Sequence, residues 1–376
     1  MTFARLAAVA AAALAVLPAA ASAATPEEVA SLRLPDGFKA ELFAEVPGAR
    51  EMAVMDDGRT IFVSTRGETV WRLDDEDGDG RPDARTAVIT DGKMPHGIDI
   101  GPDGRLYVVE THRVRRFALS DTWPREPGPG EVLHEGLIDR RHHGWRAAEF
   151  GPDGLLYAAV GAPCNICAVE GLAATLVRFD PETWEPEVIA RGVRNSVGFD
   201  WHPVTGVLHF TDNGGDNMGD HIPPDEFNRL DAPGQHYGFP FVWGKAEKPY
   251  PQFADATPPE GTVTPLAEIE AHAGALGMVF YTGAMFPEEY RNDAFIALQG
   301  SWNRDPMDPS GYQLLRARFS ADGGFERLEV FADGFLAGQS SRTAWGKPAQ
   351  LALLPDGSLL IGDDYAGAIY RIFYAR

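Results

Sequence analysis

The sequence predicts an all-β protein, a six-bladed β-propeller, from two observations. The first is a phrase that recurs along the chain, a tight turn followed by a short apolar run. Its early copies are about fifty residues apart, which is the period of a propeller blade. The second is the content of 41 Gly and 29 Pro in 376 residues, which indicates many turns and therefore many short strands. No segment after the N-terminal region has the apolar period of a long helix.

The recurring phrase occurs six times. Two copies of its turn, at 101–104 and 151–154, read Gly-Pro-Asp-Gly. Six copies, each belonging to a blade of four short strands, predict six blades. The copies are 55–58 before 61–63, 101–104 before 106–108, 151–154 before 156–158, 201–203 before 207–210, 286–287 before 294–297, and 354–357 before 359–361.

The remaining segments fit the same architecture. Residues 39–43 alternate between polar and apolar types and form the first expected strand. The longer gap between the fourth and fifth copies contains an insertion at 223–265, rich in Pro and Gly. Residues 370–374 are a candidate for the strand that closes the ring. We expect residues 25–376 to form a single propeller domain.

Residues 1–24 are predicted to be a secretory signal. Arg5 supplies the positive charge, residues 6–18 are an apolar run too short to span a bilayer comfortably, and Ala21-Ser22-Ala23 fits a cleavage site. The alternative is an uncleaved anchor. No other apolar run reaches membrane length, so we expect a periplasmic or secreted protein without a membrane span. The net charge of -22 argues against nucleic acid as a partner.

The two cysteines, Cys164 and Cys167, are predicted to form a small structural disulfide, the usual state in an oxidising compartment. A c-type haem would require histidine after Cys167, where Ala168 stands. Two cysteines cannot close a structural zinc site. A thioredoxin-like redox role would require a βαβ context, which the pattern does not show.

Two acidic segments are candidate calcium sites. In 75–83 the glycines turn the loop, so that alternate carboxylates can converge between two outer strands; the alternative is a solvated acidic hairpin. In 212–228 glycines expose backbone carbonyls among carboxylates, and the alternative there is a polar turn with Asx caps. The candidate carboxylate ligands are Asp75, Asp77, Asp79 and Asp83 in the first segment, and Asp225 and Glu226 in the second.

Several basic residues fall near predicted strand starts in a protein that is otherwise acidic. His143, beside His142, is a candidate general base because the pKa of histidine lies near neutral pH, although a histidine pair is equally common on a surface. Arg194 and Asn195 precede the fourth copy of the phrase. Together with Arg304 and Lys347 they suggest a polyanionic small ligand at the centre of the ring.

These segments resemble the soluble pyrroloquinoline quinone (PQQ)-dependent sugar dehydrogenases of the glucose/sorbosone dehydrogenase branch, over nearly the whole mature chain. The resemblance is carried by the segments His-Gly-Trp-Arg at 143–146, Gly-Val-Arg-Asn at 192–195, Asp-Asn-Gly-Gly-Asp at 212–216, Pro-Asp-Glu-Phe-Asn at 224–228, Tyr-Gly-Phe-Pro at 237–240, Gly-Ser-Trp-Asn-Arg at 300–304 and Asp-Asp-Tyr-Ala-Gly at 363–367.

The resemblance implies a six-bladed propeller that holds PQQ and calcium at the top of its channel. It implies that His143 is catalytic and that Arg194 holds a quinone oxygen. The remaining implied roles are cofactor contacts from Asn195, Lys347 and Arg304, and calcium ligands from the carbonyls of Gly214 and Gly215.

The implied reaction oxidises an aldose at C1 to a lactone. His143 takes the hydroxyl proton, hydride passes to PQQ, and an external electron acceptor reoxidises the cofactor. One alternative is a calcium-dependent sugar lactonase, which would hold its ion deep in the channel with acidic ligands. The other is a non-catalytic exported propeller that binds sugar or protein.

Overall fold

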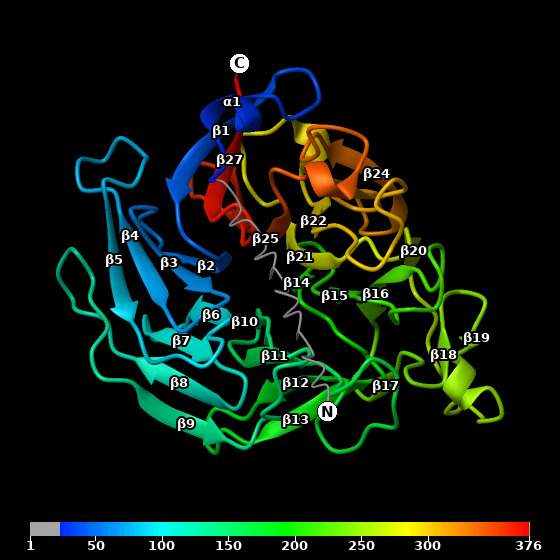
Figure 1. The fold of residues 1–376 in the computed structure, drawn as a ribbon. Coiled ribbons are helices and arrows are strands. Elements are labelled where there is room, and N and C mark those ends of the chain that lie inside the picture. Colours follow the sequence, from blue (N-terminus) through cyan, green and yellow to red (C-terminus); the bar gives the residue numbers. More distant parts are fainter. Residues whose placement is uncertain (1–22, 376) are drawn as a thin grey trace, which may run out of the picture.

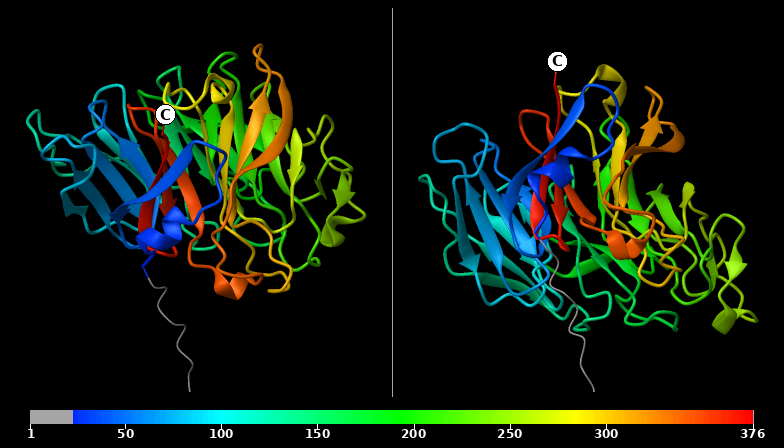
Figure 2. Two further views of the ribbon diagram at one scale, coloured as in Figure 1. Left: turned by 90° about the horizontal axis from the view of Figure 1, so that it is seen from above. Right: turned by 45° about the horizontal axis from the view of Figure 1, so that its top comes forward.

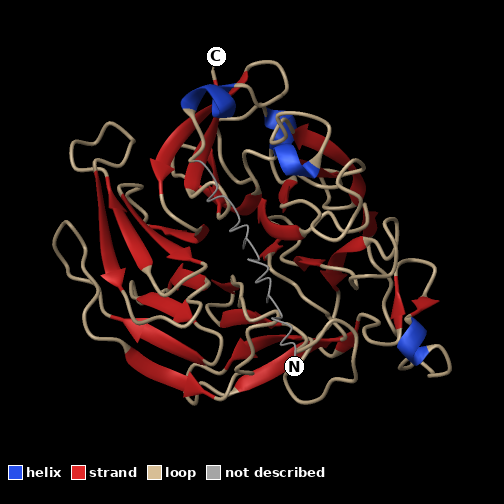
Figure 3. Cartoon of the chain, in the orientation of Figure 1, coloured by secondary structure: helices blue, strands red, loops and turns tan. Residues whose placement is uncertain are grey.

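The protein is described here in a computed structural model that covers residues 23–375. The predicted signal therefore lies outside the described residues, except for Ala23 and Ala24. The chain forms six antiparallel sheets of four main strands that radiate from a common axis (Figures 1 and 3). Side views show the strands running between the two faces of this wheel (Figure 2). The predicted six-bladed β-propeller is confirmed.

In each of the first three blades the strands follow the chain order from the axis outward. Blade 1 contains β2 (Ala49–Val54), β3 (Thr60–Thr65), β4 (Val70–Asp74) and β5 (Ala84–Ile89). Blade 2 contains β6 (Gly97–Ile100), β7 (Leu106–Val109), β8 (Arg113–Phe117) and β9 (Glu131–Glu135). Blade 3 contains β10 (Ala148–Phe150), β11 (Leu156–Val160), β12 (Thr175–Phe179) and β13 (Pro186–Arg191).

Blades 4 and 5 repeat this order, and blade 6 closes the ring. Blade 4 contains β14 (Phe199–Trp201), β15 (Leu208–Asp212), β16 (Asp225–Leu230) and β20 (Ala267–Ile269). Blade 5 contains β21 (Ala275–Phe280), β22 (Ala294–Leu298), β23 (Gln313–Phe319) and β24 (Phe325–Ala332). Blade 6 contains β25 (Pro348–Leu353), β26 (Leu359–Asp363), β27 (Ala368–Tyr374) and, outermost, β1 (Phe38–Glu45).

The ring closes by pairing the two ends of the chain. β1 runs antiparallel to β27, with Phe38 opposite Tyr374 and Glu45 opposite Ala368. The ring of Phe38 makes edge contacts with four aromatic rings, so the closing strand is anchored by packing as well as by hydrogen bonds. The prediction that 370–374 closes the ring is confirmed, with 38–45 as its partner.

The recurring turn connects the innermost strand of a blade to the second strand, in all six blades. It does not mark the boundary between blades. Gly104 and Gly154 have φ values of 71° and 77°, a left-handed conformation that favours glycine. The second strand that follows is buried along its whole length in every blade, which explains why the apolar run after the turn is the strongest pattern in the sequence.

The apolar core lies between neighbouring blades. Six clusters of buried residues each join strands of two adjacent blades. Between blades 1 and 2, for example, Phe62 and Ala53 pack with Ile98 and Leu106. This arrangement leaves the axis itself free for polar side chains.

The predicted insertion at 223–265 begins too early, because 225–230 form the third strand of blade 4; the segment from 231 onward lies between the third and fourth strands. It places β17 (Gln235–His236) parallel to β13 at the edge of blade 3, and a small hairpin outside the ring (Figure 1). The hairpin consists of β18 (Val242–Trp243) and β19 (Lys248–Pro249). The chain also contains four short helices within the described residues: α1 (Pro26–Ala30), η1 (Pro251–Phe253), η2 (Glu288–Tyr290) and η3 (Ser341–Thr343). Within residues 23–375 there is no helix long and apolar enough to cross a membrane.

Candidate active site

A cavity of about 290 Å³ opens on one face of the wheel, at the axis. Its walls come from loops that precede innermost strands and from loops that follow second strands. The first kind includes the segment before β10, with His143, and the segment before β14, with Arg194 and Asn195. The second kind includes Gly214 after β15 and Asp364 after β26. Residues that are far apart in the sequence therefore meet here.

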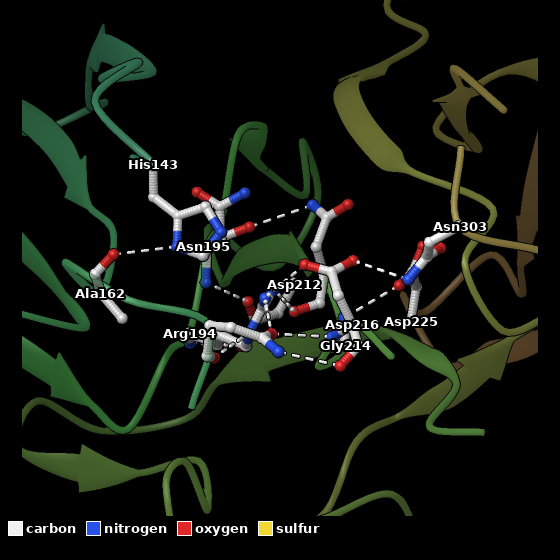
Figure 4. A network of polar contacts seen from close by, with 11 residues as sticks. His143, Ala162, Arg194, Asn195, Asp212, Gly214, Asp216, Asp225 and Asn303 are labelled. Carbon is white, nitrogen blue, oxygen red and sulfur yellow. Dashed lines mark hydrogen bonds and ion pairs between the residues drawn. The ribbon is translucent and has the colours of Figure 1, made fainter. Parts of the chain in front are cut away.

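His143 stands in the wall of this cavity with one ring nitrogen occupied. Its Nδ1 lies 2.9 Å from the carbonyl oxygen of Ala162 (Figure 4). Because a carbonyl only accepts, Nδ1 carries the proton, and Nε2 is left as a hydrogen-bond acceptor. Burial, followed by the nearby charge of Arg194, lowers the pKa of His143 to about 2. The imidazole is therefore neutral at physiological pH, as a general base must be.

The local backbone brings His143 close to its neighbours. His143 has a φ of 50°, which is uncommon for a residue other than glycine. A Cβ atom on Gly161 would lie 2.6 Å from the Cβ of His143 and 2.9 Å from the Oδ1 of Asn195. Gly161 thus allows the base and Asn195 to approach each other.

Arg194 is buried beside the cavity and held at all three of its guanidinium nitrogens. Nε donates to the carbonyl of Asn165 at 2.9 Å, and NH1 donates to the carbonyl of Asn213 at 3.0 Å. NH2 donates to Oδ1 of Asn165 at 2.8 Å and forms an ion pair with Asp216 at 3.0 Å (Figure 4). The charge is therefore fixed in place before any ligand binds, which is what electrostatic catalysis requires.

Asp212 fixes the backbone of the same segment. Its carboxylate accepts the backbone N–H of Arg194 at 2.8 Å and that of Asn195 at 2.6 Å. Burial, together with the charge of Glu226, raises the pKa of Asp212 to about 8. This carboxyl group supports the loop and does not line the cavity.

Two arginines that the sequence analysis did not single out also line the cavity. Arg50, on β2, forms a buried ion pair with Asp364 at 2.6 Å, and Arg66, after β3, lies 3.6 Å from the same carboxylate. Both guanidinium groups stand 5.3 Å from the ring centre of Trp145. No local motif marked them, because Arg50 lies within an ordinary strand and Arg66 directly follows one. Asp364 lies close to both arginines and also accepts a hydrogen bond from Gln299.

The two other cations assigned to the cofactor by resemblance do not line the cavity. Arg304 is bound by Glu270 and Asp308, each at 2.9 Å, and does not line the cavity. Lys347 lies next to the lining residue Asp364, whose charge acts on it; its Nζ is 5.1 Å from the ring of Tyr365, and burial lowers its pKa. Arg50 and Arg66 line the cavity together with Arg194, and cofactor contacts from Arg304 and Lys347 stay predictions.

Comparison with known proteins identifies the family. A profile of the TrAA12-like family matches residues 32–374, nearly the whole described chain. The chain belongs to the TrAA12-like family. This is a family of PQQ-dependent pyranose dehydrogenases, so the predicted resemblance is confirmed.

The relatives agree with this assignment. An uncharacterized protein of Borreliella burgdorferi is 31% identical to the TrAA12-like chain over 374 residues, which cover 93% of each protein. The holo form of the pyranose dehydrogenase PQQ domain from Coprinopsis cinerea has a TM-score of 0.75 and 19% identity, over 91% of this chain and 97% of that one. The calcium structure of the Trichoderma reesei family AA12 enzyme has a TM-score of 0.78 and 17% identity, over 92% and 98%. At these identities the two structures show a shared fold.

The loop that was expected to bind calcium in the TrAA12-like protein reaches the cavity in part. Gly214 and Asp225 line the cavity, whereas Gly215 packs against Tyr250 and Glu226 faces a narrow void behind the wall. Both oxygens of Asp225 accept backbone N–H groups, one from Gly214 at 2.9 Å. One oxygen of Glu226 likewise accepts a backbone N–H. Asp225 therefore braces the loop, Glu226 braces the insertion at Gly244, and the carbonyl oxygens of the loop are the better candidates for an ion.

The acidic loop of blade 1 lies far from the cavity, between β4 and β5. Ligand atoms of Asp75, Asp77 and Asp83 lie within 4.8 Å of one another. Asp79 is not in this group, and its Oδ1 accepts the N–H of Arg81. The loop brings three of the four predicted ligands together, and calcium there stays a prediction.

Four further carboxylates lie beneath the cavity; three of them line a space of about 170 Å³ in the channel, and Asp200 lies close enough for its charge to raise the pKa of Glu149. Glu51, Asp99, Glu149 and Asp200 come from the innermost strands of blades 1 to 4. Burial raises the pKa of Asp99 to about 6 and that of Asp200 to about 7. Burial and the neighbouring carboxylates raise the pKa of Glu149 well above its ordinary value. Asp99, Glu149 and Asp200 each lie just before a copy of the recurring turn, and this position is the sequence signal that could have located them.

Proposed function

We propose that this protein is a PQQ- and calcium-dependent aldose dehydrogenase that oxidises a sugar at C1 to a lactone. The observation that carries the proposal is the meeting of two groups at one cavity. His143 is neutral with a free Nε2, and Arg194 is a buried cation whose position is already fixed. Membership of the TrAA12-like family supports the same reaction.

The residues present fit a polyanionic cofactor. Three arginines line the cavity, in a protein with a net charge of -22. The Nε atom of Arg50 is buried and has no hydrogen-bond partner among the described residues, so it is available to an anionic ligand. Arg50, Arg66 and Arg194 would hold PQQ, and the side chain of Asn195 would contact it from the same wall.

The protein's own groups supply binding, orientation and proton transfer. Bound PQQ would supply the acceptor for the hydride, which carries the two electrons that leave C1. His143 would receive the hydroxyl proton at Nε2, while its Nδ1 stays bonded to Ala162. Arg194 would stabilise negative charge that develops on the acceptor, because its guanidinium cannot turn away. Trp302, 73% exposed at the rim, is placed to stack on a sugar ring.

A calcium ion in the cavity would use oxygen ligands of the loop after β15. Gly214 offers its carbonyl, and Asp216 and Asn213 also line the cavity. The predicted signal at 1–24 supports export to the periplasm or beyond, where an external electron acceptor would complete the cycle.

The proposal is tested by titrating purified protein with PQQ, with and without calcium, and following cofactor absorbance. We expect saturable binding that calcium strengthens, and a spectral change when an aldose is added. A panel of aldoses would then identify the substrate. Failure to bind PQQ at micromolar concentrations with calcium present would refute the proposal.

One observation favours a second candidate function. The lactonase alternative predicts carboxylates deep in the channel; Glu51, Asp99 and Glu149 line a space there, and Asp200 lies near Glu149. Against it, burial raises the pKa of all four carboxyl groups, so an ion would have to displace protons from part of the set near neutral pH. Hydrolysis of a sugar lactone by calcium-loaded protein without PQQ would support this function. A protein that neither binds PQQ nor hydrolyses lactones would be the non-catalytic propeller.

A further inference from the structure

The segment that follows β11 contacts both members of the proposed reaction centre. The carbonyl of Ala162 accepts a hydrogen bond from Nδ1–H of His143 (Figure 4). The N–H of Ala162 donates to the carbonyl of Arg194 at 2.8 Å. Three residues further on, Asn165 contacts the guanidinium of Arg194. One short loop thus positions both the base and the cation.

Asn165 uses its whole side-chain amide for this purpose. Its Oδ1 accepts from NH2 of Arg194 at 2.8 Å and from the N–H of Asp216 at 2.8 Å, while its Nδ2 donates to the carbonyl of Asp216 at 2.9 Å. Its backbone carbonyl accepts from Nε of Arg194. Two of the four hydrogen bonds of the guanidinium therefore end on Asn165, and the same residue ties the cation to the loop that carries Gly214.

The conformation of this segment is held by a disulfide. Cys164 and Cys167 are bonded to each other, and Asn165 and Ile166 lie between them. No strand or helix includes the segment, so its backbone is restrained by the disulfide together with the hydrogen bonds of Ala162 and Asn165. Ile166 adds contact on the other side, because a Cβ on Gly215 would lie 3.3 Å from it.

We propose that the disulfide-closed loop 161–167 is the positioning element of the reaction centre, and that Asn165 is the positioning residue through which it holds Arg194. That this loop matters for catalysis rests on the proposed function. The contacts by which the loop holds Arg194 are present in the protein without cofactor. Both cysteines are partly exposed, so a reductant can reach them. The oxidised bridge is then a condition for a competent site, and reduction would loosen Arg194 while the blades stay folded.

The experiment compares four samples: wild type, wild type reduced with a phosphine, Asn165→Ala, and the matched control Glu170→Ala at an exposed site just beyond the loop. Amide hydrogen exchange of the cofactor-free protein is measured for peptides covering 192–197 and 212–218. We expect exchange about tenfold faster in Asn165→Ala and in the reduced protein, the factor that corresponds to one lost hydrogen bond to a charged group. Exchange in β22, buried in blade 5, should change less than exchange at 192–197, because the blades stay folded.

PQQ affinity provides the second readout. We expect Asn165→Ala and the reduced protein to bind PQQ about tenfold more weakly, and Glu170→Ala to match the oxidised wild type. Unchanged exchange at 192–197 in both perturbed samples would overturn the inference. Faster exchange with unchanged PQQ affinity would overturn the assignment of Asn165 to the reaction centre. If wild type itself does not bind PQQ, the proposed function fails, while the exchange result still decides whether the loop braces Arg194.

Discussion

Replacing His143 by Gln tests the assignment of the base. Glutamine keeps a neutral side chain with an N–H that can still donate to the carbonyl of Ala162, but it cannot accept a proton from the sugar. A positioned general base contributes about a hundredfold to ten-thousandfold, or about 3 to 5 kcal/mol of barrier. We therefore expect the rate of sugar-dependent cofactor reduction to fall by that factor, with PQQ affinity nearly unchanged.

The ionisation of His143 sets the expected pH dependence. A pKa of about 2, compared with 6.5 for free histidine, corresponds to a cost of about 6 kcal/mol for protonating the imidazole in the empty cavity. The rate constant kcat/KM should then show no loss from protonation of His143 between pH 5 and pH 8, since the group charges only in much stronger acid.

The assay mixes PQQ-loaded protein rapidly with an aldose, without external acceptor, and follows the absorbance of the bound cofactor. This single-turnover design excludes the reoxidation step. His142→Gln is the matched control, because His142 is exposed although its ring lies 4.0 Å from that of His143. Reduction in His143→Gln within threefold of the wild-type rate, at equal PQQ occupancy, would show that His143 is not the base.

Three further predictions concern stability and the channel. Arg50→Met should lower the free energy of unfolding by about 3 kcal/mol, because it removes the buried cation from Asp364 and leaves that carboxylate with only Gln299 and the more distant Arg66. Arg66→Met, at a half-exposed site, should cost under about 1 kcal/mol, and equal denaturation midpoints for the two variants would contradict this. Phe38→Ala should cost about 3 to 5 kcal/mol by opening the ring closure, and a loss below about 1 kcal/mol in the same assay would show that the closing strand is not anchored there. The pKa of Glu149 is raised in the folded protein, so its deprotonation destabilises the fold as pH rises above the unfolded value. Glu149→Gln should therefore raise the melting temperature in chelator more at pH 8 than at pH 5, and an equal change at both pH values would contradict the shift.

Much of the fold could be predicted because the strongest pattern has a simple physical origin. The second strand of each blade is buried on both faces, so it reads as an apolar run, and a glycine in a left-handed turn precedes most copies. The partner of the closing strand was less evident, because β1 and β27 lie at opposite ends of the chain. Strand β17 carries no pattern of its own, since it is two residues long and pairs only at an edge.

The site was predictable only where function depends on a local motif. His143 and Arg194 each lie just before an innermost strand, so their positions in the sequence were enough to predict that they lie near the axis. Arg50 and Arg304 show the limit of that reasoning. Both are arginines near strands, but Arg50 pairs with Asp364 at the cavity and Arg304 pairs with Glu270 and Asp308 away from it. The carboxylate with which an arginine pairs depends on how loops from different blades meet, and a local sequence pattern does not contain that information.

The most direct test of the central claim counts product against cofactor. Protein loaded with one equivalent of PQQ and with calcium is mixed with excess aldose in the absence of an electron acceptor, and lactone is quantified. The account predicts one lactone per bound PQQ, followed by continued turnover only after an artificial acceptor is added. Fully loaded protein that yields no lactone from any aldose, or lactone formed equally well without PQQ, would contradict it.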